Sequence, residues 1–326
     1  MATISKFRFQ AIDCTACAKN EPEFLGVRGG VAHLRELGEL TTIVRCRNCT
    51  HQYANPMPFP IGGLNTLYAD ATEYFRGHNV EEKKVHGIQL IKRFEEKAGR
   101  KGTILDIGCG TGEIMWAAVQ CGWNEEGVDT SSEFIAIGRS NLGVNGRICT
   151  LEAADFPSDH FDAILMSGII EHLYDPHATL QEVSRVLKPG GWLWLDAPNE
   201  ASLYSAIGNL YMGIRRKSAV LVTAPTFAPF HVQGFSPQSI GHLLRRSELD
   251  LKDITTGGYV FQQTGQYSLR KQFEYCVARL INWLGTKVRR GTYMTAWAQK
   301  PLSTCNGNFV RIFIRSEKWT MSILGC

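Results

Sequence analysis

The chain has 326 residues, 44% of them hydrophobic, and a net charge of +4 at pH 7. This length accommodates one full-sized core and a small appendage, and so mild a positive charge does not by itself indicate nucleic-acid binding. No apolar run approaches the roughly 20 residues of a membrane-spanning helix, and residues 1–14 lack the apolar stretch of a secretory signal. The ten cysteines do not follow the spacing of a disulfide framework, so we expect a reducing, cytoplasmic compartment.

Residues 1–58 form the first expected module, because they contain two CxxC pairs. The pairs are Cys14 with Cys17 and Cys46 with Cys49, and 28 residues separate Cys17 from Cys46. Thiolates at such a spacing are typical of a tetrahedral zinc site, and closed coordination of this kind is structural rather than catalytic. We therefore predict a zinc-ribbon-like module. The alternative is a set of reduced thiols without a metal.

Residues 59–100 follow a proline-rich exit and are expected to form a helical linker that also serves as a lid over the ligand site. Apolar residues recur at every third position among charged ones, at Val85, Ile88, Ile91 and Phe94. This periodicity indicates an amphipathic helix.

From residue 101 to residue 326, short apolar runs alternate with helical segments. Strands are expected at residues 103–107, 125–129, 147–151, 161–166, 192–198, 249–255 and 308–316, and helices at residues 113–120, 131–141, 176–188 and 237–247. This alternation predicts a doubly wound, mostly parallel α/β sheet. Residues 199–235 and 257–307 are expected to be insertions that cover the substrate, because open α/β sheets bind ligands beyond the carboxyl ends of their strands.

The first strand of this domain leads into a glycine loop, residues 108–112, whose glycines are spaced GxGxG. The dinucleotide fingerprint is GxGxxG, and here Glu113 occupies the place of the third glycine; the Lys-Ser/Thr pair of a P-loop is also absent. Asp106 lies just before the loop, where a carboxylate would repel a pyrophosphate and would suit an ammonium or sulfonium cation. The loop therefore predicts a nucleoside ligand without a phosphate.

Two further carboxylates extend this ligand site. Asp129 ends the second strand, 21 residues after Gly108, where a carboxylate can accept both hydrogen bonds of a ribose diol. Asp155 follows the third strand and can accept a hydrogen bond from an adenine amino group, with Phe156 beside the ring. The alternative for Asp155 is that it caps a turn before Pro157.

Together these motifs resemble those of class I S-adenosylmethionine-dependent methyltransferases. The matching segments are "LDIGCGTGE", "GVDTS", "AADFPSDHFDAI", "IIEHLYDP" and "RVLKPGGWLWLDAPN", in the family's order, and they span about residues 100–255. The resemblance implies a Rossmann-like sheet of seven strands, one of them antiparallel, with residues 308–316 as that last strand.

The resemblance also implies S-adenosylmethionine as the cofactor and indicates where it binds. The methionine part would lie against the glycine loop and the carboxylate before it, the ribose against the second-strand carboxylate, and the adenine near the third. The residues expected to contact the cofactor are Asp106, Gly108, Cys109, Gly110, Gly112, Asp129, Thr130, Asp155, Phe156 and Ser167.

The N-terminal region extends the resemblance to methyltransferases of bacterial polysaccharide and secondary-metabolite clusters. Those proteins begin with a cysteine-paired zinc module, a proline-rich exit and a tyrosine-containing segment. The similar stretches here are "CRNCTHQYANPMP" and "LYADATEYF". Some sugar C-methyltransferases have a similar front end.

A base is needed only if the methyl acceptor is a hydroxyl or a carbon acid, and three residues lie where one is expected. They are Glu171 and His172, after the fourth strand, and His231, near the end of the first insertion. The Glu-His pair resembles that of ubiquinone-pathway O-methyltransferases, in which another glutamate three residues earlier helps to hold a divalent metal. Gly168 stands at that position here, so neither the metal nor a quinol acceptor carries over. The alternative is that Glu171 and His172 only support the cofactor loop and His231 is an ordinary loop residue.

Residues 267–290 are expected to form a basic amphipathic helix. Its apolar face consists of Phe273, Cys276, Val277, Leu280 and Leu284, with arginine and lysine residues around it. Such a helix can lie on an anionic membrane surface or cover a lipid-like acceptor, which would place the protein at the inner membrane face. The alternative is that the helix packs on its own domain or on a second copy of the chain.

The sequence therefore predicts a cytoplasmic S-adenosylmethionine-dependent methyltransferase that modifies an oxygen or a carbon of a small-molecule, sugar or lipid-linked acceptor. One alternative is an RNA methyltransferase that grips nucleic acid through the zinc module. Basic and acidic residues nearly balance in residues 1–58, so no nucleic-acid partner is expected. Another alternative is a non-catalytic binding module with a methyltransferase fold, which the intact cofactor residues disfavour.

Overall fold

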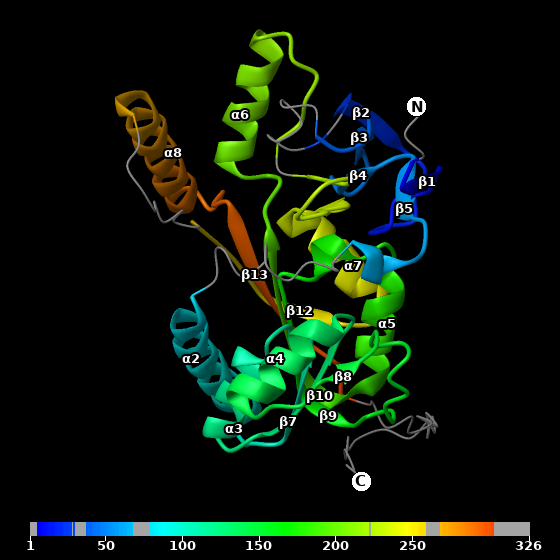
Figure 1. The fold of residues 1–326 in the computed structure, drawn as a ribbon, viewed down its shortest axis with the longest axis vertical. Coiled ribbons are helices and arrows are strands. Elements are labelled where there is room, and N and C mark those ends of the chain that lie inside the picture. The colour runs from blue at the N-terminus through cyan, green and yellow to red at the C-terminus, as the bar shows by residue number, and fades with distance from the viewer. Residues whose placement is uncertain are drawn as a thin grey trace, which may run out of the picture.

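The computed structural model describes residues 5–27, 29, 37–67, 79–221, 223–258 and 268–302. A large sheet and its helices form one end of the molecule (Figure 1). The N-terminal strands lie at the other end, together with helices α6 (Leu203–Ile214) and α8 (Leu269–Lys287). Residues 199–235 connect the two ends, because they leave the large sheet and then return to it.

The large sheet has seven strands in the order β12-β13-β10-β9-β6-β7-β8. In chain order the strands are β6 (Thr103–Ile107), β7 (Asn124–Asp129), β8 (Arg147–Ile148), β9 (Phe161–Ser167), β10 (Leu187–Pro198), β12 (Asp250–Gly257) and β13 (Tyr293–Gln299). β13 runs antiparallel to both of its neighbours, whereas the strands from β10 to β8 are mutually parallel. The predicted mostly parallel, seven-stranded α/β sheet is confirmed.

Helices cover both faces of this sheet. One face carries α2 (Val80–Ala98), α3 (Glu113–Gln120) and α4 (Ser132–Leu142), and the other carries α5 (Pro176–Val186) and α7 (Pro237–Arg246). Short polar side chains set where these helices begin. Asn79, Ser131 and Asp175 each accept a hydrogen bond from a backbone amide of the following first turn. These bonds satisfy donors that a helix leaves unpaired at its start.

The antiparallel strand differs from the prediction. Residues 308–316 lie outside the described residues, and the strand beside β10 is Tyr293–Gln299, inside the segment predicted to be an insertion. Its alternate residues Met294, Ala296 and Ala298 are buried. Alanine at two of these three positions gives the strand a weak apolar pattern, although its neighbours cover it well.

Helix α2 is rotated relative to its predicted apolar face. Its buried residues include Gly87, Ile91 and Phe94, whereas the predicted Val85 is 57% exposed. A helix repeats every 3.6 residues, so a three-residue repeat drifts away from the buried face within two turns. Gly87 lets α3 approach closely, because a Cβ at this position would lie 2.9 Å from the Cβ of Ala117.

The N-terminal residues form two small sheets. One pairs β1 (Phe7–Gln10) with β5 (Met57–Pro60), and the other has the order β11-β4-β3-β2. The strands of the second sheet are β2 (Pro22–Val27), β3 (Thr42–Cys46), β4 (Gln52–Ala54) and β11 (Gln233–Gly234). β11 comes from the expected insertion, which therefore completes the N-terminal sheet.

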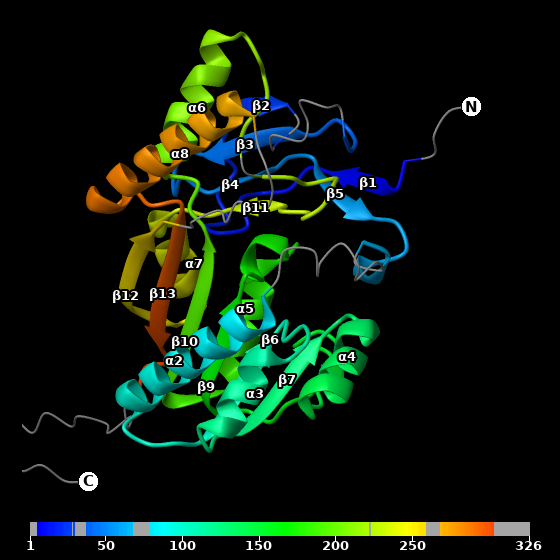
Figure 2. The same ribbon diagram turned by 60° about the vertical axis from the view of Figure 1, so that its left-hand side comes forward.

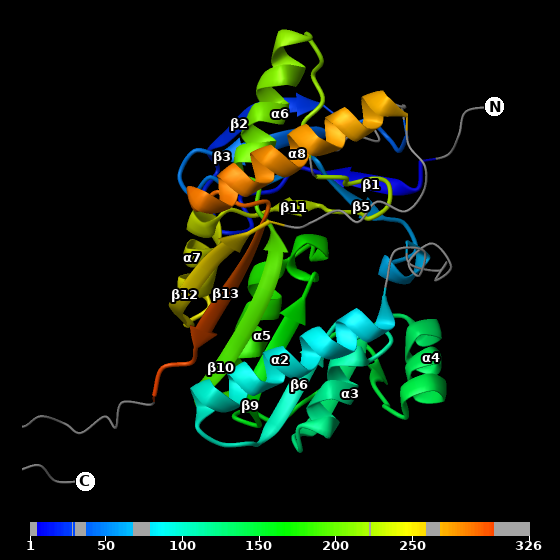
Figure 3. The same cartoon turned by 90° about the vertical axis from the view of Figure 1, so that its left-hand side faces the viewer.

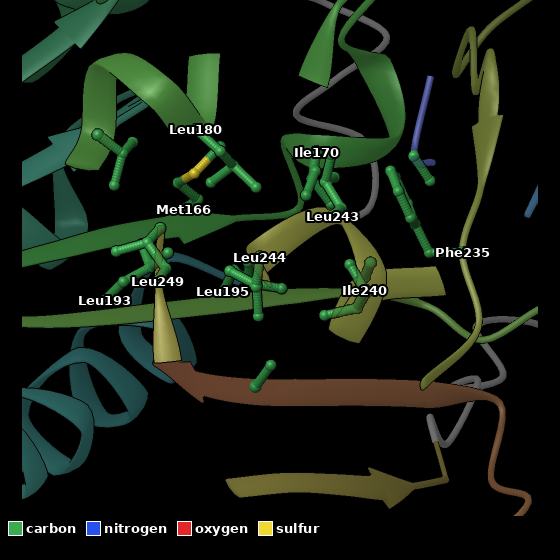
Figure 4. Close-up of a cluster of buried hydrophobic side chains, with 14 of the residues drawn as sticks. Met166, Ile170, Leu180, Leu193, Leu195, Phe235, Ile240, Leu243, Leu244 and Leu249 are labelled. Carbon is green, nitrogen blue, oxygen red and sulfur yellow. The ribbon is translucent and has the colours of Figure 1, made fainter. Parts of the chain in front are cut away.

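One continuous hydrophobic cluster joins the N-terminal strands to the α5 and α7 face of the large sheet. Tyr53, Met57 and the buried cysteines of the two CxxC pairs belong to the same cluster as the inner residues of β9 and β10. Figure 4 shows its central part, with Met166, Ile170, Leu180, Leu193, Leu195, Phe235, Ile240, Leu243, Leu244 and Leu249 labelled. The N-terminal strands are thus held to the large sheet by apolar packing as well as by β11.

Candidate active site

The glycine loop connects β6 to α3 at the carboxyl end of the parallel strands. Gly108, Gly110 and Gly112 have φ values of 70°, 54° and 80°, in the left-handed region that favours glycine. A Cβ at Gly108 would lie 2.1 Å from Cδ1 of Ile169, so the loop touches the segment that follows β9. Cys109, a predicted contact, is buried in the small apolar cluster beneath the loop. Cys109 can therefore contact a cofactor only through its backbone atoms.

Asp129 ends β7 and holds the glycine loop through its carboxylate. Oδ2 accepts a hydrogen bond from the amide of Gly110 at 2.9 Å, and Oδ1 accepts one from the amide of Ser131 at 2.8 Å. Burial raises the pKa of this carboxyl group. Each oxygen keeps a lone pair for a further donor, as a ribose diol would require. Thr130 lies half-buried beside it.

Three carboxyl groups gather around the loop. Asp106 is buried, and its pKa is raised to about 8 by burial and by the charges of Asp129 and Glu113. Glu113 is itself buried and accepts a hydrogen bond from the hydroxyl of Thr111. Carboxyl groups this close together oppose one another's ionisation, and a cation among them would favour their charged forms, so the site fits the ammonium and sulfonium groups of S-adenosylmethionine. In the sequence, Glu113 stands out only as the residue in the place of the third glycine of the dinucleotide fingerprint.

The two residues predicted near adenine have different surroundings. Asp155 is exposed, and its φ is 51°. Phe156 is buried, with its ring edge-on to Phe161 at 5.0 Å between centroids. The guanidinium of Arg147 lies 4.3 Å from the centre of the Phe156 ring. Core packing alone explains the place of Phe156, and the adenine contacts of both residues stay predictions.

Two polar residues that the sequence did not reveal, Asp196 of β10 and Tyr293 of β13, lie beside the predicted Ser167 at the end of β9. Asp196 is buried, which raises its pKa to about 7, although hydrogen bonds from Gly168, Tyr293 and Ser167 act in the opposite direction. The amide of Gly168 donates to its Oδ1 at 2.6 Å. A Cβ at Gly168 would lie 3.9 Å from the hydroxyl of Tyr293 and 3.9 Å from Oε1 of Glu171. Asp196 could have been found as a carboxylate that ends an apolar strand, the signal used for two other residues.

The three residues predicted as bases come together next to this group. Glu171 and His172 lie in the 3-10 turn Ile170–His172, directly after the Ile169 contact with the glycine loop, and His231 comes from the connection between the two ends. Oε1 of Glu171 is 4.0 Å from Nε2 of His231, and the rings of His172 and His231 are 4.8 Å apart between centroids. Oε2 of Glu171 is buried and has no hydrogen-bond partner among the described residues.

Burial sets the charge state of these three residues. It raises the pKa of Glu171 to about 8, and the charge of Asp196 adds to this effect. It lowers the pKa of His172 to about 4 and the pKa of His231 to about 3. At neutral pH both imidazoles are therefore neutral, and the carboxyl group titrates close to the range in which a general base works best. One donor atom of each residue lies within 4.8 Å of the others, so the set can also hold a cation.

The four cysteines of the CxxC pairs also come together. Sγ of Cys14 is 3.5 Å from Sγ of Cys49, Sγ of Cys17 is 3.5 Å from Sγ of Cys46, and all four lie within 4.8 Å of one another. Tetrahedral zinc with bonds of about 2.3 Å to sulfur places its ligands about 3.8 Å apart. The geometry of the four thiols fits a zinc ion.

Hydrogen bonds link the cysteine cluster to the base residues through one side chain, Gln233. Its Oε1 lies 2.8 Å from Nε2 of His51 and accepts a hydrogen bond from the hydroxyl of Thr15 at 3.0 Å. Its Nε2 donates to the carbonyl of Leu173, the neighbour of His172, at 3.0 Å. Because Thr15 lies inside the first cysteine pair and His51 follows the second, Gln233 ties both pairs to the segment after β9.

A family model described as a methyltransferase domain matches residues 77–253, more than half of the chain. The chain belongs to this family and is a class I S-adenosylmethionine-dependent methyltransferase. The predicted class of enzyme and its cofactor are thereby confirmed.

Individual relatives can be compared over the same region. The chain is 30% identical over 187 residues to the ubiquinone biosynthesis O-methyltransferase of Pseudomonas aeruginosa (strain UCBPP-PA14), which covers 53% of this chain and 77% of that protein. An enzyme of the same name from Nitrosospira multiformis is 26% identical over 196 residues, covering 56% of this chain and 77% of the relative. A solved SAM-dependent methyltransferase from Archaeoglobus fulgidus has a TM-score of 0.48 and 23% identity, covering 72% of this chain and 99% of that chain.

Proposed function

We propose that this enzyme methylates a hydroxyl group of a small-molecule acceptor, with Glu171 as the general base. The observation that carries the proposal is the buried carboxyl group of Glu171, whose Oε2 has no hydrogen-bond partner among the described residues, and which lies beside His231 and two residues after Ile169, the contact of the glycine loop. The similarity to ubiquinone biosynthesis O-methyltransferases supports oxygen as the accepting atom.

In this proposal S-adenosylmethionine, when bound, supplies a methyl carbon that its sulfonium has already activated. Asp106 and the glycine loop would hold the methionine part, and Asp129 would hold the ribose. The protein then has to position the acceptor oxygen and remove its proton.

We assign removal of the proton to the carboxyl group and positioning of the acceptor oxygen to the neutral histidines. The pKa of Glu171 is about 8 and that of His231 about 3, so the carboxylate is the stronger base of the pair. His231 and His172, neutral at pH 7, would orient the acceptor hydroxyl through hydrogen bonds. Gly168 stands where the ubiquinone-pathway pattern has an acidic metal ligand. We therefore assign the proton transfer to Glu171 rather than to a metal-bound hydroxyl.

We also propose that Cys14, Cys17, Cys46 and Cys49 hold a structural zinc ion. The sulfur positions support this assignment, and a reducing cytoplasmic setting would keep the thiols available as ligands. The zinc would take no part in methyl transfer, because four protein ligands close its coordination.

Label transfer tests the acceptor class. The enzyme is incubated with radiolabelled S-adenosylmethionine and host extract, and label is counted in lipid, small-molecule, polysaccharide, RNA and protein fractions. Label in the small-molecule or lipid fraction that hot hydriodic acid releases as methyl iodide, as it does from a methyl ether but not from a carbon-bound methyl group, supports O-methylation of a hydroxyl. Label confined to RNA would contradict the proposal and favour a nucleic-acid role for the N-terminal module.

Glu171→Gln tests the base, because it keeps the shape and removes the titrating group. We expect the rate of methyl transfer to fall about a hundredfold or more, with unchanged affinity for S-adenosylhomocysteine. Glu200→Gln is the matched control, since Glu200 is another buried glutamate whose pKa burial raises to about 8. An equal loss in both variants would show that any buried glutamate matters, and the assignment of Glu171 would be wrong.

A further inference from the structure

Helices α6 and α8 present apolar side chains to solvent. The two helices contact each other near one end, where the amide of Leu203 donates to the carbonyl of Arg290 at 2.9 Å. The exposed large apolar residues are Ile207, Leu210, Tyr211 and Ile214 on α6, and Phe273, Val277, Leu280, Trp283, Leu284 and Val288 on or just after α8. The most exposed are Ile214, at 73%, and Phe273, at 70%. So many exposed apolar side chains on two helices that contact each other mark an interaction site rather than scattered exposure.

The same two segments concentrate the positive charge of the chain. Residues 203–217 contain three basic and no acidic side chains, and residues 268–290 contain six basic and one acidic. We call these two segments the helix platform. Its net charge is +8, whereas the whole chain carries +4, so the rest of the chain is net negative by 4. The positive charge is therefore concentrated in the two segments that carry the exposed apolar side chains.

The helix platform lies at the acceptor end of the large sheet. α6 follows the end of β10 and opens the segment that carries His231, and α8 leads into β13, whose first residue is Tyr293. Figures 2 and 3 show α6 and α8 at the same end of the molecule as the N-terminal strands and beyond the ends of β10 and β13, and Figure 1 shows α6 between α8 and those strands. A surface that binds the platform would thus lie on the same side of the large sheet as His231 and Tyr293.

We propose that the helix platform docks the enzyme on an anionic lipid bilayer. Exposed leucine, isoleucine, phenylalanine and tryptophan side chains insert at the boundary of headgroups and acyl chains, and the surrounding lysine and arginine side chains bind anionic headgroups. A second copy of the chain fits this surface less well, because a symmetric contact would place two platforms of charge +8 against each other. Within the described part of the chain, no helix has the length and apolar character needed to cross a membrane.

Vesicle co-sedimentation of the full-length enzyme tests the proposal. We expect binding to vesicles that contain phosphatidylglycerol, at least tenfold weaker binding to pure phosphatidylcholine, and a further loss in about 0.5 M salt. The triple variant Ile214→Ser, Phe273→Ser, Trp283→Ser should reduce binding to anionic vesicles at least tenfold. Val85→Ser with Val119→Ser is the matched control, since both residues are exposed and lie on α2 and α3.

A charge-reversal variant separates the contribution of the basic side chains to vesicle binding from that of the apolar side chains. Arg216→Glu with Arg289→Glu should also reduce anionic binding at least tenfold, whereas Lys92→Glu with Arg93→Glu on α2 should not. Affinity for S-adenosylhomocysteine, measured on every variant, shows that the fold is intact and does not depend on the acceptor. The proposal is wrong if the wild-type enzyme ignores anionic vesicles, or if the triple variant still binds them. It is also wrong if the triple variant instead turns a dimer into a monomer, because the platform would then be an interface between copies.

Discussion

Replacing Gln233 by leucine should damage methyl transfer without weakening cofactor binding. Gln233 is 1% exposed, and its side chain makes three hydrogen bonds, to His51, Thr15 and the carbonyl of Leu173. Leucine has a similar volume but makes none of these bonds. At about 1 kcal/mol for each net hydrogen bond, the loss of stability is about 3 kcal/mol, and more if the buried partners stay unpaired.

The functional effect follows from the position of Leu173, one residue after His172. A displacement of about 1 Å in a catalytic segment can reduce the rate about a hundredfold, so we expect a loss of about tenfold to a hundredfold. Methyl transfer is measured with labelled S-adenosylmethionine and the extract fraction that accepts label, and cofactor affinity is measured by calorimetry with S-adenosylhomocysteine. Thermal unfolding of the same samples gives the change in stability.

Gln299→Leu is the matched control for this experiment. Gln299 donates one hydrogen bond, to the carbonyl of Gly190 at 2.9 Å, at the other end of β13 from the acceptor site. It should lower stability by about 1 kcal/mol and leave methyl transfer unchanged. If Gln233→Leu loses stability but transfers methyl groups at the normal rate, the link between the cysteine cluster and the acceptor site has no functional role. If it loses cofactor affinity as well, the effect is not specific to the acceptor side.

Three further predictions address the cofactor, the metal and the buried acids. Asp129→Ala should weaken S-adenosylhomocysteine binding by about 1.5–3 kcal/mol in calorimetry, through the lost charge-assisted bonds to the ribose; unchanged affinity would contradict the placement of the site. Cys46→Ser should abolish the one zinc per chain that elemental analysis of chelator-free wild-type protein should find, and should lower the melting temperature; wild-type protein without zinc would rule out the metal site. Glu200 keeps its proton in the folded state up to about pH 8 but loses it near pH 4.5 when unfolded, so its contribution to stability falls as pH rises through this window. Glu200→Gln should therefore raise the melting temperature relative to wild type more at pH 9 than at pH 5, and a pH-independent difference would refute the raised pKa.

The order of strands and helices could be predicted because local signals determine it. A carboxylate at the end of an apolar strand identified Asp106 and Asp129, and helix caps such as Asp175 marked the helix starts. β13 could not be found in this way, because its place depends on pairing with β10 rather than on its own apolar pattern. Residues 308–316 show a stronger alternation of apolar and polar residues than β13 does. A single sequence does not show which of these two segments pairs with β10.

Only some residues of the acceptor site could be predicted, because the others reach the site through strand pairing. Glu171 and His172 stand in a motif, and His231 lies near the end of an insertion, so sequence position alone suggested them. Tyr293 reaches the site only through the antiparallel register that sets Pro198 opposite it. Gln233 depends on the two-residue pairing of β11 with β4, which is too short to leave a pattern.

β11 and the N-terminal strands share one sheet, and this limits which N-terminal regions the gene can acquire by recombination. A recombination event that exchanges residues 1–58 with another front end would leave β11 beside a strand that did not evolve with it. Gln233, His51 and Thr15 would then have to be replaced as a set, because a mismatch leaves buried hydrogen-bonding groups unpaired. We therefore expect these three positions to be inherited together when the acceptor specificity of related enzymes diverges.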